Sequence, residues 1–336
     1  MMEVSFIIPI YNTEESLLLR CFNSILNLRD IKYEVLLIDD GSQNFVEQFC
    51  KQFSITHPTF HYFKKNNEGV SEARNYGINK AIGKYIFFID SDDSIVPECF
   101  NEPLMNNKFD IIIFDLALSN KFKSVVWKSF EHNSREVESK EAILDMMYSG
   151  CLNSPCSKLI KRDLIIKNKI YFDKNLITGE DADFILNIFL LAPSIYYVNK
   201  VIYHYFRTNE SSRKRMLSNP EKLVENYEYH KFKKMKILDQ LEIDCNSKKN
   251  AKIALISTEI KNIFNLVLEL QQEGLFSDSL EKKIIQAIKH IEISILMECK
   301  FSTKLRYYII HKKKWKIMIG IQSIRRIYLT FRGLHI

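Results

Sequence analysis

Short, continuous runs of apolar residues alternate with longer amphipathic stretches along the first part of the chain. Apolar runs rich in aromatic and β-branched residues are typical of strands buried on both faces, whereas apolar residues at every third or fourth position are typical of helices. The apolar runs predict strands at 4–8, 34–38, 60–63 and 85–89, and the amphipathic stretches predict helices at 15–28, 44–53 and 71–82. Ser71 is the expected N-cap of the helix at 71–82. This alternation predicts a doubly wound α/β sheet with right-handed crossovers.

The pattern becomes increasingly helical in the rest of the chain. Apolar residues recur three or four positions apart over 253–270 and 280–295, which predicts the packing faces of a small helical domain. Before them the pattern predicts strands at 111–118, 123–127 and 198–207 and helices at 138–148 and 182–191. We therefore expect an α/β domain over 1–215, a helical domain over 216–300 and a separate tail over 301–336.

Three carboxylates, Asp90, Asp92 and Asp93, follow the predicted strand at 85–89. Ligands of open α/β sheets bind at the carboxyl ends of the strands, and carboxylates gathered beside a buried strand repel one another unless something compensates. A divalent cation with hard oxygen ligands, such as Mg²⁺ or Mn²⁺, would compensate. The alternative is that these residues only turn the chain and cap the next helix.

Glycine is too sparse for the usual phosphate-binding loops. The chain has nine glycines, and no two are closer than six positions. A G-x-G-x-x-G fingerprint and a P-loop are therefore impossible, which excludes a classical dinucleotide dehydrogenase and a P-loop kinase. A bound diphosphate would have to be neutralised by a metal and by cationic side chains.

Four motifs occur in a fixed order: V-S-F-I-I-P-I-Y-N at 4–12, L-L-I-D-D-G-S at 36–42, N-N-E-G-V-S-E-A-R-N-Y-G at 66–77 and D-S-D-D at 90–93. This series resembles the family 2 glycosyltransferases of the GT-A fold. The resemblance implies a Rossmann-like mixed sheet followed by a helical region. It also implies that Asp90-Ser91-Asp92 is the D-x-D motif, with Asp92 holding Mn²⁺ or Mg²⁺ on a sugar-nucleotide diphosphate and Asp90 near the ribose.

The same resemblance assigns the nucleotide site. Tyr11 would lie against the base, with Pro9 shaping the turn, and Asp40 would accept the imide N–H of uracil. Arg74 would face the nucleotide or its phosphates. Taken alone, Asp40-Gly41 is a common turn, and Arg74 would more often be a solvated helix residue.

Two further segments match the family. G-E-D at 179–181 implies Asp181 as the catalytic base, with Glu180 positioning the acceptor or the base, although adjacent carboxylates before a helix can also be caps. The segment from 203 implies that Arg207 and Ser212 belong to a loop that closes over the diphosphate. Lys158 lies in a basic segment that we expect to be solvated; the alternative is that Lys158 approaches a phosphate.

The resemblance implies an inverting glycosyltransferase that moves a hexose or N-acetylhexosamine from a UDP-sugar to a hydroxyl of a glycan in capsule, O-antigen or exopolysaccharide synthesis, and we expect that glycan to be lipid-linked. Two alternatives stay open: a catalytically inactive GT-A scaffold and a nucleotidyltransferase. A nucleic-acid partner is not expected, because a carboxylate-lined crevice repels a polyanion.

Positive charge is concentrated at the end of the chain. Residues 300–336 hold ten Lys and Arg and no acid, and removing these charges from the net +7 leaves the rest at −3. Apolar residues spaced by three or four over 317–331 predict a basic amphipathic helix on an anionic membrane surface, or alternatively a stripe packed on the helical domain. With no apolar run of spanning length and no basic leader, we expect a cytoplasmic protein, peripheral on the inner face of the membrane. Seven scattered cysteines predict reduced thiols and no zinc site.

Overall fold

The computed structural model describes residues 2–100, 108–119, 124–131, 133–148, 150–206 and 217–314. The chain divides into two compact units, Met1–Asn209 and Glu210–Ile336. The division falls near the expected boundary after residue 215, and the described part of the expected tail belongs to the same unit as the helical region. Arg207, Ser212 and the predicted amphipathic helix at 317–331 lie outside the described residues.

A mixed sheet organises the first unit, and its described strands follow the order β3-β2-β1-β4-β9-β6-β10-β5, with β7 beside β6 and β8 beside β10. Strand β1 is parallel to β2 and β4, and β2 is parallel to β3. Strand β9 lies antiparallel between β4 and β6. The strands are β1 Val4–Ile10, β2 Tyr33–Asp39, β3 Phe60–Lys64, β4 Tyr85–Phe88, β5 Ser94–Ile95, β6 Ile111–Ser119, β7 Ser124–Trp127, β8 Arg135–Val137, β9 Lys158–Lys161 and β10 Ile195–Phe206. The expected α/β architecture with a mixed sheet is confirmed.

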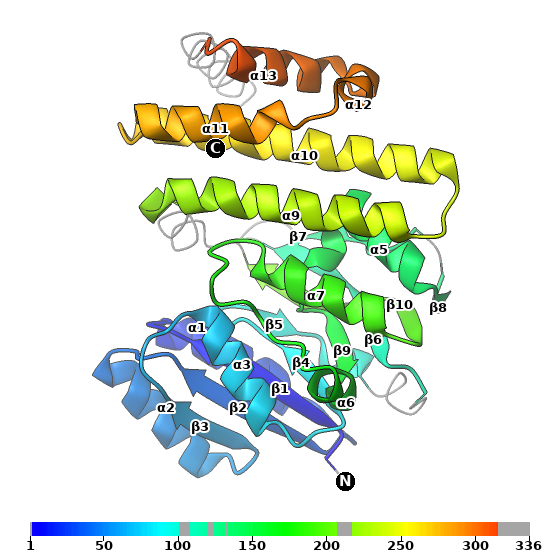
Figure 1. The fold of residues 1–336 in the computed structure, drawn as a ribbon. Coiled ribbons are helices and arrows are strands. Elements are labelled where there is room, and N and C mark those ends of the chain that lie inside the picture. The colour runs from blue at the N-terminus through cyan, green and yellow to red at the C-terminus, as the bar shows by residue number, and fades with distance from the viewer. Residues whose placement is uncertain are drawn as a thin grey trace. The chain divides into compact units, whose positions relative to one another are not determined.

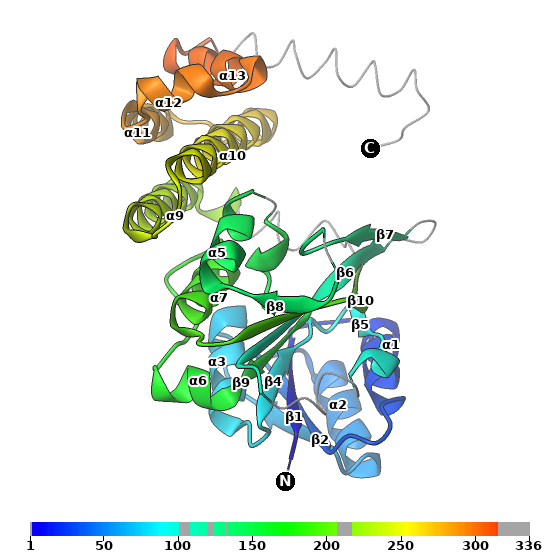
Figure 2. The same ribbon diagram turned by 90° about the vertical axis from the view of Figure 1, so that its right-hand side faces the viewer.

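Helices cover both faces of this sheet. Figure 2 shows α1 and α2 on one face and α3, α6 and α7 on the other. The helices of this unit are α1 Glu15–Leu26, α2 Asn44–Thr56, α3 Val70–Lys80, α5 Ser139–Tyr148, α6 Arg162–Lys167 and α7 Glu180–Leu191, with short 3₁₀ turns at Pro97–Cys99 and Cys151–Asn153. Helices on both faces explain why β1 and β4 are buried along their whole length.

The start of α3 differs from the expected one. Gly69, not Ser71, is the N-cap, and Gly69 has a φ of 94°. This positive φ suits glycine and brings the Gly69 N–H to 2.8 Å from Asp40 Oδ2. Ser71 therefore lies inside the first turn, where it is buried.

Aromatic side chains and one close contact hold the sheet core together. Phe6 and Phe87, on adjacent strands, pack edge-on against each other and against Phe100, and the ring centroids of the three pairs are 5.1–5.7 Å apart. Burying a phenylalanine side chain stabilises a fold by about 1.5–3 kcal/mol. A Cβ added at Gly77 would lie 2.5 Å from Ile7 Cγ2, so glycine lets α3 approach β1.

The second unit is helical throughout its described part (Figure 1). Its helices are α9 Pro220–Gln240, α10 Cys245–Gln272, α11 Asp278–Lys289, α12 Ile293–Glu298 and α13 Phe301–His311. Helix α9 packs against α10 and α11, and α13 packs against the same two helices. Most residues of the two predicted apolar stripes are buried in this core. No helix within the described ranges is both long enough and apolar enough to cross a membrane.

Candidate active site

The loops that follow β1, β2 and β4 meet at one edge of the sheet. The chain passes from β1 outward to β2 and β3, then returns through α3 to β4 on the other side of β1. Such a reversal of strand order is where α/β sheets bind ligands. Two hydrogen bonds join the loops: the Asn12 N–H donates to Ser42 Oγ at 3.0 Å, and Thr13 Oγ1 lies 2.7 Å from Ser91 Oγ.

The D-S-D-D segment forms a tight turn after β4. The Asp93 N–H donates to the carbonyl of Asp90 at 3.0 Å. Asp90 and Asp92 are partly exposed, whereas Ser91 is buried beside Thr13. Arg20 of α1 donates to the backbone carbonyl of Asp92. The turn is thus fixed through its backbone, which leaves two of its carboxylates at the surface.

Asp93 points into the core, so the three carboxylates do not act as one cluster. Its side chain is fully buried and accepts hydrogen bonds from Tyr203 Oη at 2.6 Å and from the Phe206 N–H at 2.7 Å. Burial raises the pKa of Asp93 to about 8, and the charge of Asp90 adds to the effect. Asp93 therefore connects the turn to β10.

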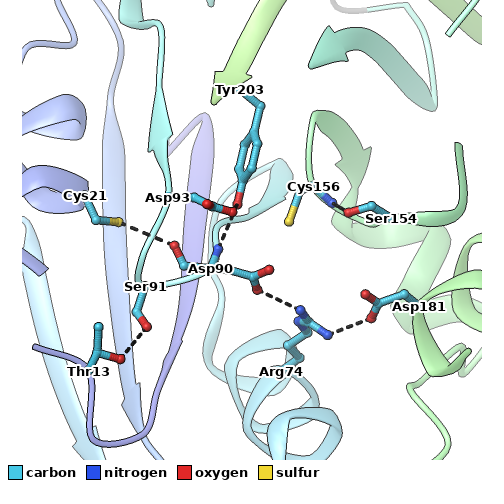
Figure 3. A network of polar contacts seen from close by, with 10 residues as sticks. All are labelled: Thr13, Cys21, Arg74, Asp90, Ser91, Asp93, Ser154, Cys156, Asp181 and Tyr203. Atoms are coloured by element: carbon cyan, nitrogen blue, oxygen red, sulfur yellow. Dashed lines mark hydrogen bonds and ion pairs between the residues drawn. The ribbon is translucent and has the colours of Figure 1, made fainter. Parts of the chain in front are cut away.

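Tyr203 extends this connection to the D-x-D backbone. The Asp90 N–H donates to Tyr203 Oη at 3.0 Å, while the same hydroxyl donates to Asp93 (Figure 3). Arg20 adds a second support, because its guanidinium lies 3.7 Å above the Phe206 ring. The last residues of β10 thus help to fix the turn that carries Asp90 and Asp92.

Arg74 joins the D-x-D motif to the G-E-D motif. Its Nη2 lies 2.8 Å from Asp90 Oδ1, and its Nη1 lies 2.7 Å from Asp181 Oδ1 (Figure 3). The Arg74 side chain is 4% exposed and each carboxylate is 33% exposed. Burial lowers the pKa of Arg74, but the two carboxylates outweigh it, so the net pKa is raised. The solvated alternative for Arg74 is therefore wrong.

One N–H group of Arg74 is not used in these contacts. Its Nε is buried and has no hydrogen-bond partner among the described residues. The guanidinium lies 5.2 Å from the centroid of the Phe172 ring, which covers one of its faces. This arrangement orients the two terminal nitrogens towards the carboxylates.

Glu180 and Asp181 occupy the first turn of α7. Gly179 is the N-cap, with a φ of 78°, so the helix begins at the G-E-D motif itself. Carboxylates in a first turn are favoured by the helix dipole. Glu180 is buried, whereas Asp181 is partly exposed beside Arg74. Of the two, Asp181 is the one that an acceptor could reach.

Asp40 anchors the loop that leads into α3. Its Oδ1 accepts from Lys65 Nζ at 2.6 Å and from the Glu68 N–H at 3.0 Å, and its Oδ2 accepts from Gly69. A carboxylate oxygen can accept two hydrogen bonds, so Oδ2 retains acceptor capacity. The role of Asp40 towards uracil stays a prediction.

The other predicted nucleotide contacts lie on β1 and just after it. Pro9 is buried within β1 opposite Ile38 of β2. Tyr11, the first residue after β1, is 56% exposed. The structure thus places an accessible aromatic ring beside the loop of Asp40. The predictions for Arg207 and Ser212 lie outside the described residues.

The expectation that Lys158 is solvated is wrong. Its side chain is fully buried, and Nζ donates to the carbonyls of Ser154 at 2.6 Å and Cys156 at 3.4 Å. Burial lowers its pKa to about 8. The reason is β9, a strand within the sheet that pairs Lys158 with Ile113 of β6.

Several supporting residues carried no signal in the sequence. Arg20 and Thr13 read as ordinary residues of a helix and a loop, and Tyr203 as one aromatic residue among many. Their roles depend on contacts between segments 70 to 110 residues apart. A D-x-D-D motif and a distant tyrosine-rich strand could have been paired only by knowing the sheet order.

The described residues contain no group of three His, Cys, Asp or Glu side chains that could hold a metal ion. Mg²⁺ and Mn²⁺ sites at a substrate diphosphate need less, because the ion keeps waters and takes phosphate oxygens alongside one or two carboxylates. The carboxylate of Asp92, which is partly exposed and lies close to Asp90, offers oxygen ligands of this kind. The residues present therefore fit such an ion.

The fold and the site together define an α/β domain that brings two acidic motifs, joined by an arginine, to the ligand-binding edge of its sheet. Residues 5–167 match the model of the family described as "Glycosyl transferase family 2". This part of the chain belongs to that family, and the fold is GT-A, which confirms the resemblance seen in the motifs.

Three bacterial proteins with known names are similar to this chain. The minor teichoic acid biosynthesis protein GgaB of Bacillus subtilis is 34% identical over 64% of this chain, and the poly(ribitol-phosphate) β-N-acetylglucosaminyltransferase TarP of Staphylococcus aureus is 31% identical over 65%. The glycosyltransferase GlyA of Streptococcus pneumoniae is 25% identical over 92%. The alignments cover 24% of GgaB, 66% of TarP and 48% of GlyA, so the chain corresponds to only part of each.

A solved structure extends the likeness of fold to nearly the whole chain. S. aureus TarS residues 1–349, in complex with UDP-GlcNAc, has a TM-score of 0.70 and 19% identity, with 97% of this chain and 92% of that chain covered. The same TarS fragment has also been solved with UDP. At this identity the comparison shows the fold.

Proposed function

We propose that the chain transfers a hexose or an N-acetylhexosamine from a UDP-sugar to a hydroxyl of a bacterial cell-surface glycan, with inversion at the anomeric carbon. The observation that carries the proposal is the position of Arg74 between Asp90 and Asp181. The resemblance assigns the D-x-D motif, with Asp90, to the sugar donor and the G-E-D motif, with Asp181, to the acceptor. The guanidinium of Arg74 contacts both motifs. The teichoic acid biosynthesis named for GgaB, the poly(ribitol-phosphate) acceptor named for TarP and the nucleotides bound to TarS support it.

The reacting groups would act as follows. Asp181 accepts the proton of the acceptor hydroxyl while that oxygen bonds to the anomeric carbon on the face opposite UDP, and the bond from carbon to diphosphate oxygen breaks. An α-linked donor then gives a β-glycoside. General base catalysis of this kind contributes about 10²- to 10⁴-fold.

Arg74 would hold Asp181 ionised and correctly oriented for this step. A cation 2.7 Å from Asp181 favours the ionised carboxylate, which is the form that accepts a proton. Held by Nη1 and Nη2, the guanidinium also fixes the direction of both carboxylates. Glu180, buried at the start of α7, would position Asp181 or the acceptor.

Asp92 would hold Mn²⁺ or Mg²⁺, which when bound supplies positive charge for the leaving diphosphate. The base of the nucleotide would lie against Tyr11, with its imide N–H on Asp40. Arg207 and Ser212 would contact the diphosphate. A lipid-linked acceptor in capsule, O-antigen or exopolysaccharide synthesis would place the enzyme at the inner face of the membrane.

The test is transfer by purified protein with Mn²⁺ and a panel of UDP-sugars, scored by release of UDP with and without a glycan acceptor. Asp181→Asn keeps the size of the base but cannot accept the proton, so turnover should fall by at least about 10²-fold while UDP-sugar affinity stays within a few-fold. The matched control is Asp163→Asn, whose carboxylate is 65% exposed on α6.

Two outcomes would point to the other functions. UDP-sugar binding with no turnover for any donor or acceptor would favour a scaffold module. Release of pyrophosphate from a nucleoside triphosphate and a sugar phosphate would identify a nucleotidyltransferase. Near-normal turnover of Asp181→Asn would move the base elsewhere, with Glu180 next in line.

A further inference from the structure

Helix α13 exposes large apolar side chains on one face, although its opposite face is already packed. Ile309 and Ile310 are buried where α13 meets α10 and α11. Phe301, Leu305 and Tyr308 are 77%, 39% and 45% exposed. Spacings of four and three place these three residues, here called the α13 stripe, on a single helix face.

The preceding helix adds two residues of the same kind. Ile293 and Met297, one turn apart on α12, are 57% and 64% exposed. Single exposed apolar residues are normal on a protein surface and need no explanation. Exposed apolar side chains that recur at helical spacing within each of two consecutive helices instead mark a surface that meets another apolar phase.

Basic residues accompany the α13 stripe. From Cys299 to Lys314 the chain has six Lys and Arg and no acidic residue. Lys304 and Lys312 each lie four residues from Tyr308, so they flank the stripe on its own side of the helix. Three of the six make contacts within the unit: Lys313 pairs with Glu281 at 2.5 Å, Arg306 lies over the Phe264 ring, and Lys314 lies over the ring of Tyr308 in the stripe itself.

We propose that α12 and α13 bind the surface of an anionic lipid bilayer, with the α13 stripe in the boundary between headgroups and acyl chains. Helices that lie in this boundary combine aromatic and aliphatic side chains on one face with lysines beside them. A Lys or Arg close to an anionic leaflet is attracted by its negative surface potential. The lysines beside the stripe would contact lipid phosphates.

Lipid fits this face better than a second copy of the chain. A symmetric contact through the α13 stripe would bring two sets of the same lysines together, and like charges at a contact are unfavourable. The sequence after Lys314 adds Lys316, Arg325, Arg326 and Arg332 and no acid, so its charge favours the same partner. The proposal is independent of the transferase reaction.

Vesicle sedimentation of the full chain at physiological salt tests it. Vesicles of phosphatidylcholine with phosphatidylglycerol should bind the protein, and vesicles of phosphatidylcholine alone should bind it much less. Phe301→Ser with Leu305→Ser removes apolar area that is already exposed, so the fold should persist while partitioning falls at least about tenfold. Lys304→Gln with Lys312→Gln should weaken binding and reduce its salt dependence.

Ile55→Ser is the matched control, because Ile55 is 75% exposed on α2 in the other unit and should bind as the parent does. The proposal is wrong if the parent does not sediment with anionic vesicles, or if both double variants bind as the parent does. It is also wrong if light scattering shows a parent dimer that Phe301→Ser with Leu305→Ser abolishes, since the stripe is then a contact between copies.

Discussion

At the level of single residues, Arg74 and Lys158 show what a sequence motif does not reveal. Both are cations that are buried in the structure, Arg74 between two carboxylates and Lys158 against two backbone carbonyls. Burying a charge is costly unless it is paired or hydrogen-bonded. The family resemblance gave Arg74 a position near the nucleotide, but it did not predict that Arg74 joins the two acidic motifs.

Arg74→Lys tests that joint role. Lysine keeps the charge but has a single ammonium, so it cannot hold Asp90 and Asp181 in the planar, two-armed geometry of the guanidinium. We expect kcat to fall by about 10- to 100-fold, with a loss of about 1–3 kcal/mol in the free energy of unfolding because a buried carboxylate contact is lost. Urea unfolding and saturation kinetics measure both, and Arg29→Lys, on an exposed arginine, is the control. Unchanged kcat would mean that Arg74 is only structural.

Lys158→Met tests whether burial lowers the pKa of the Lys158 amine. Folded Lys158 has a pKa of about 8 against an ordinary value of 10.5, so between these values the unfolded chain binds more protons than the folded one. The free energy of unfolding of the parent should therefore rise relative to Lys158→Met from pH 8 to pH 10, by about 2 kcal/mol, and the difference should be constant below pH 8. Lys167→Met, 74% exposed, should follow the parent. A difference that stays flat up to pH 10 would contradict the lowered pKa.

At the level of elements, the sequence predicted the parallel strands and the helices between them, because each carries a continuous apolar run or a helical stripe. It did not predict β9, a four-residue strand whose K-L-I-K sequence reads as part of a basic segment. Nor did it predict that β10 supports the D-x-D turn through Tyr203. Both depend on strand order, which arises from packing between segments that are distant in the chain.

Tyr203→Phe tests the support from β10. Removing the hydroxyl leaves the Asp90 N–H and the buried Asp93 carboxyl without that partner, while the ring still packs. We expect the free energy of unfolding to fall by about 1–3 kcal/mol and metal-dependent UDP affinity to weaken several-fold. Tyr196→Phe, on the same strand and stacked on Phe109, is the control for losing a hydroxyl. Equal UDP affinity in parent and variant would show that the turn does not depend on this contact.

At the level of the whole molecule, the ordered motifs predicted the family and the fold of the first unit, because the motifs lie on or directly after successive strands of the chain. The helical unit was predicted only as a set of packing faces. Its buried ion pair between Lys231 and Glu259, 2.8 Å apart, has no counterpart in the apolar pattern. Burial raises the pKa of Glu259 to about 7, although Lys231 opposes the shift. Which charged residues are buried together cannot be read from spacing alone.

Ligand-dependent stability of the whole chain tests the donor site without requiring an acceptor. A ligand that binds only the folded protein raises its stability in proportion to the logarithm of ligand concentration over Kd. UDP with Mn²⁺ should therefore raise the Tm of the full chain more than CDP or GDP does, because the uracil imide N–H would donate to the remaining acceptor position on Asp40 Oδ2, and a hydrogen bond to a charged group contributes about 1.5–3 kcal/mol. Asp92→Ala should abolish the part of the shift that needs Mn²⁺ and leave the Tm of the unliganded protein nearly unchanged, since Asp92 is partly exposed. Asp163→Asn is again the matched carboxylate control. Equal shifts with UDP, CDP and GDP would refute the uridine assignment, and an undiminished Mn²⁺-dependent shift in Asp92→Ala would place the metal elsewhere.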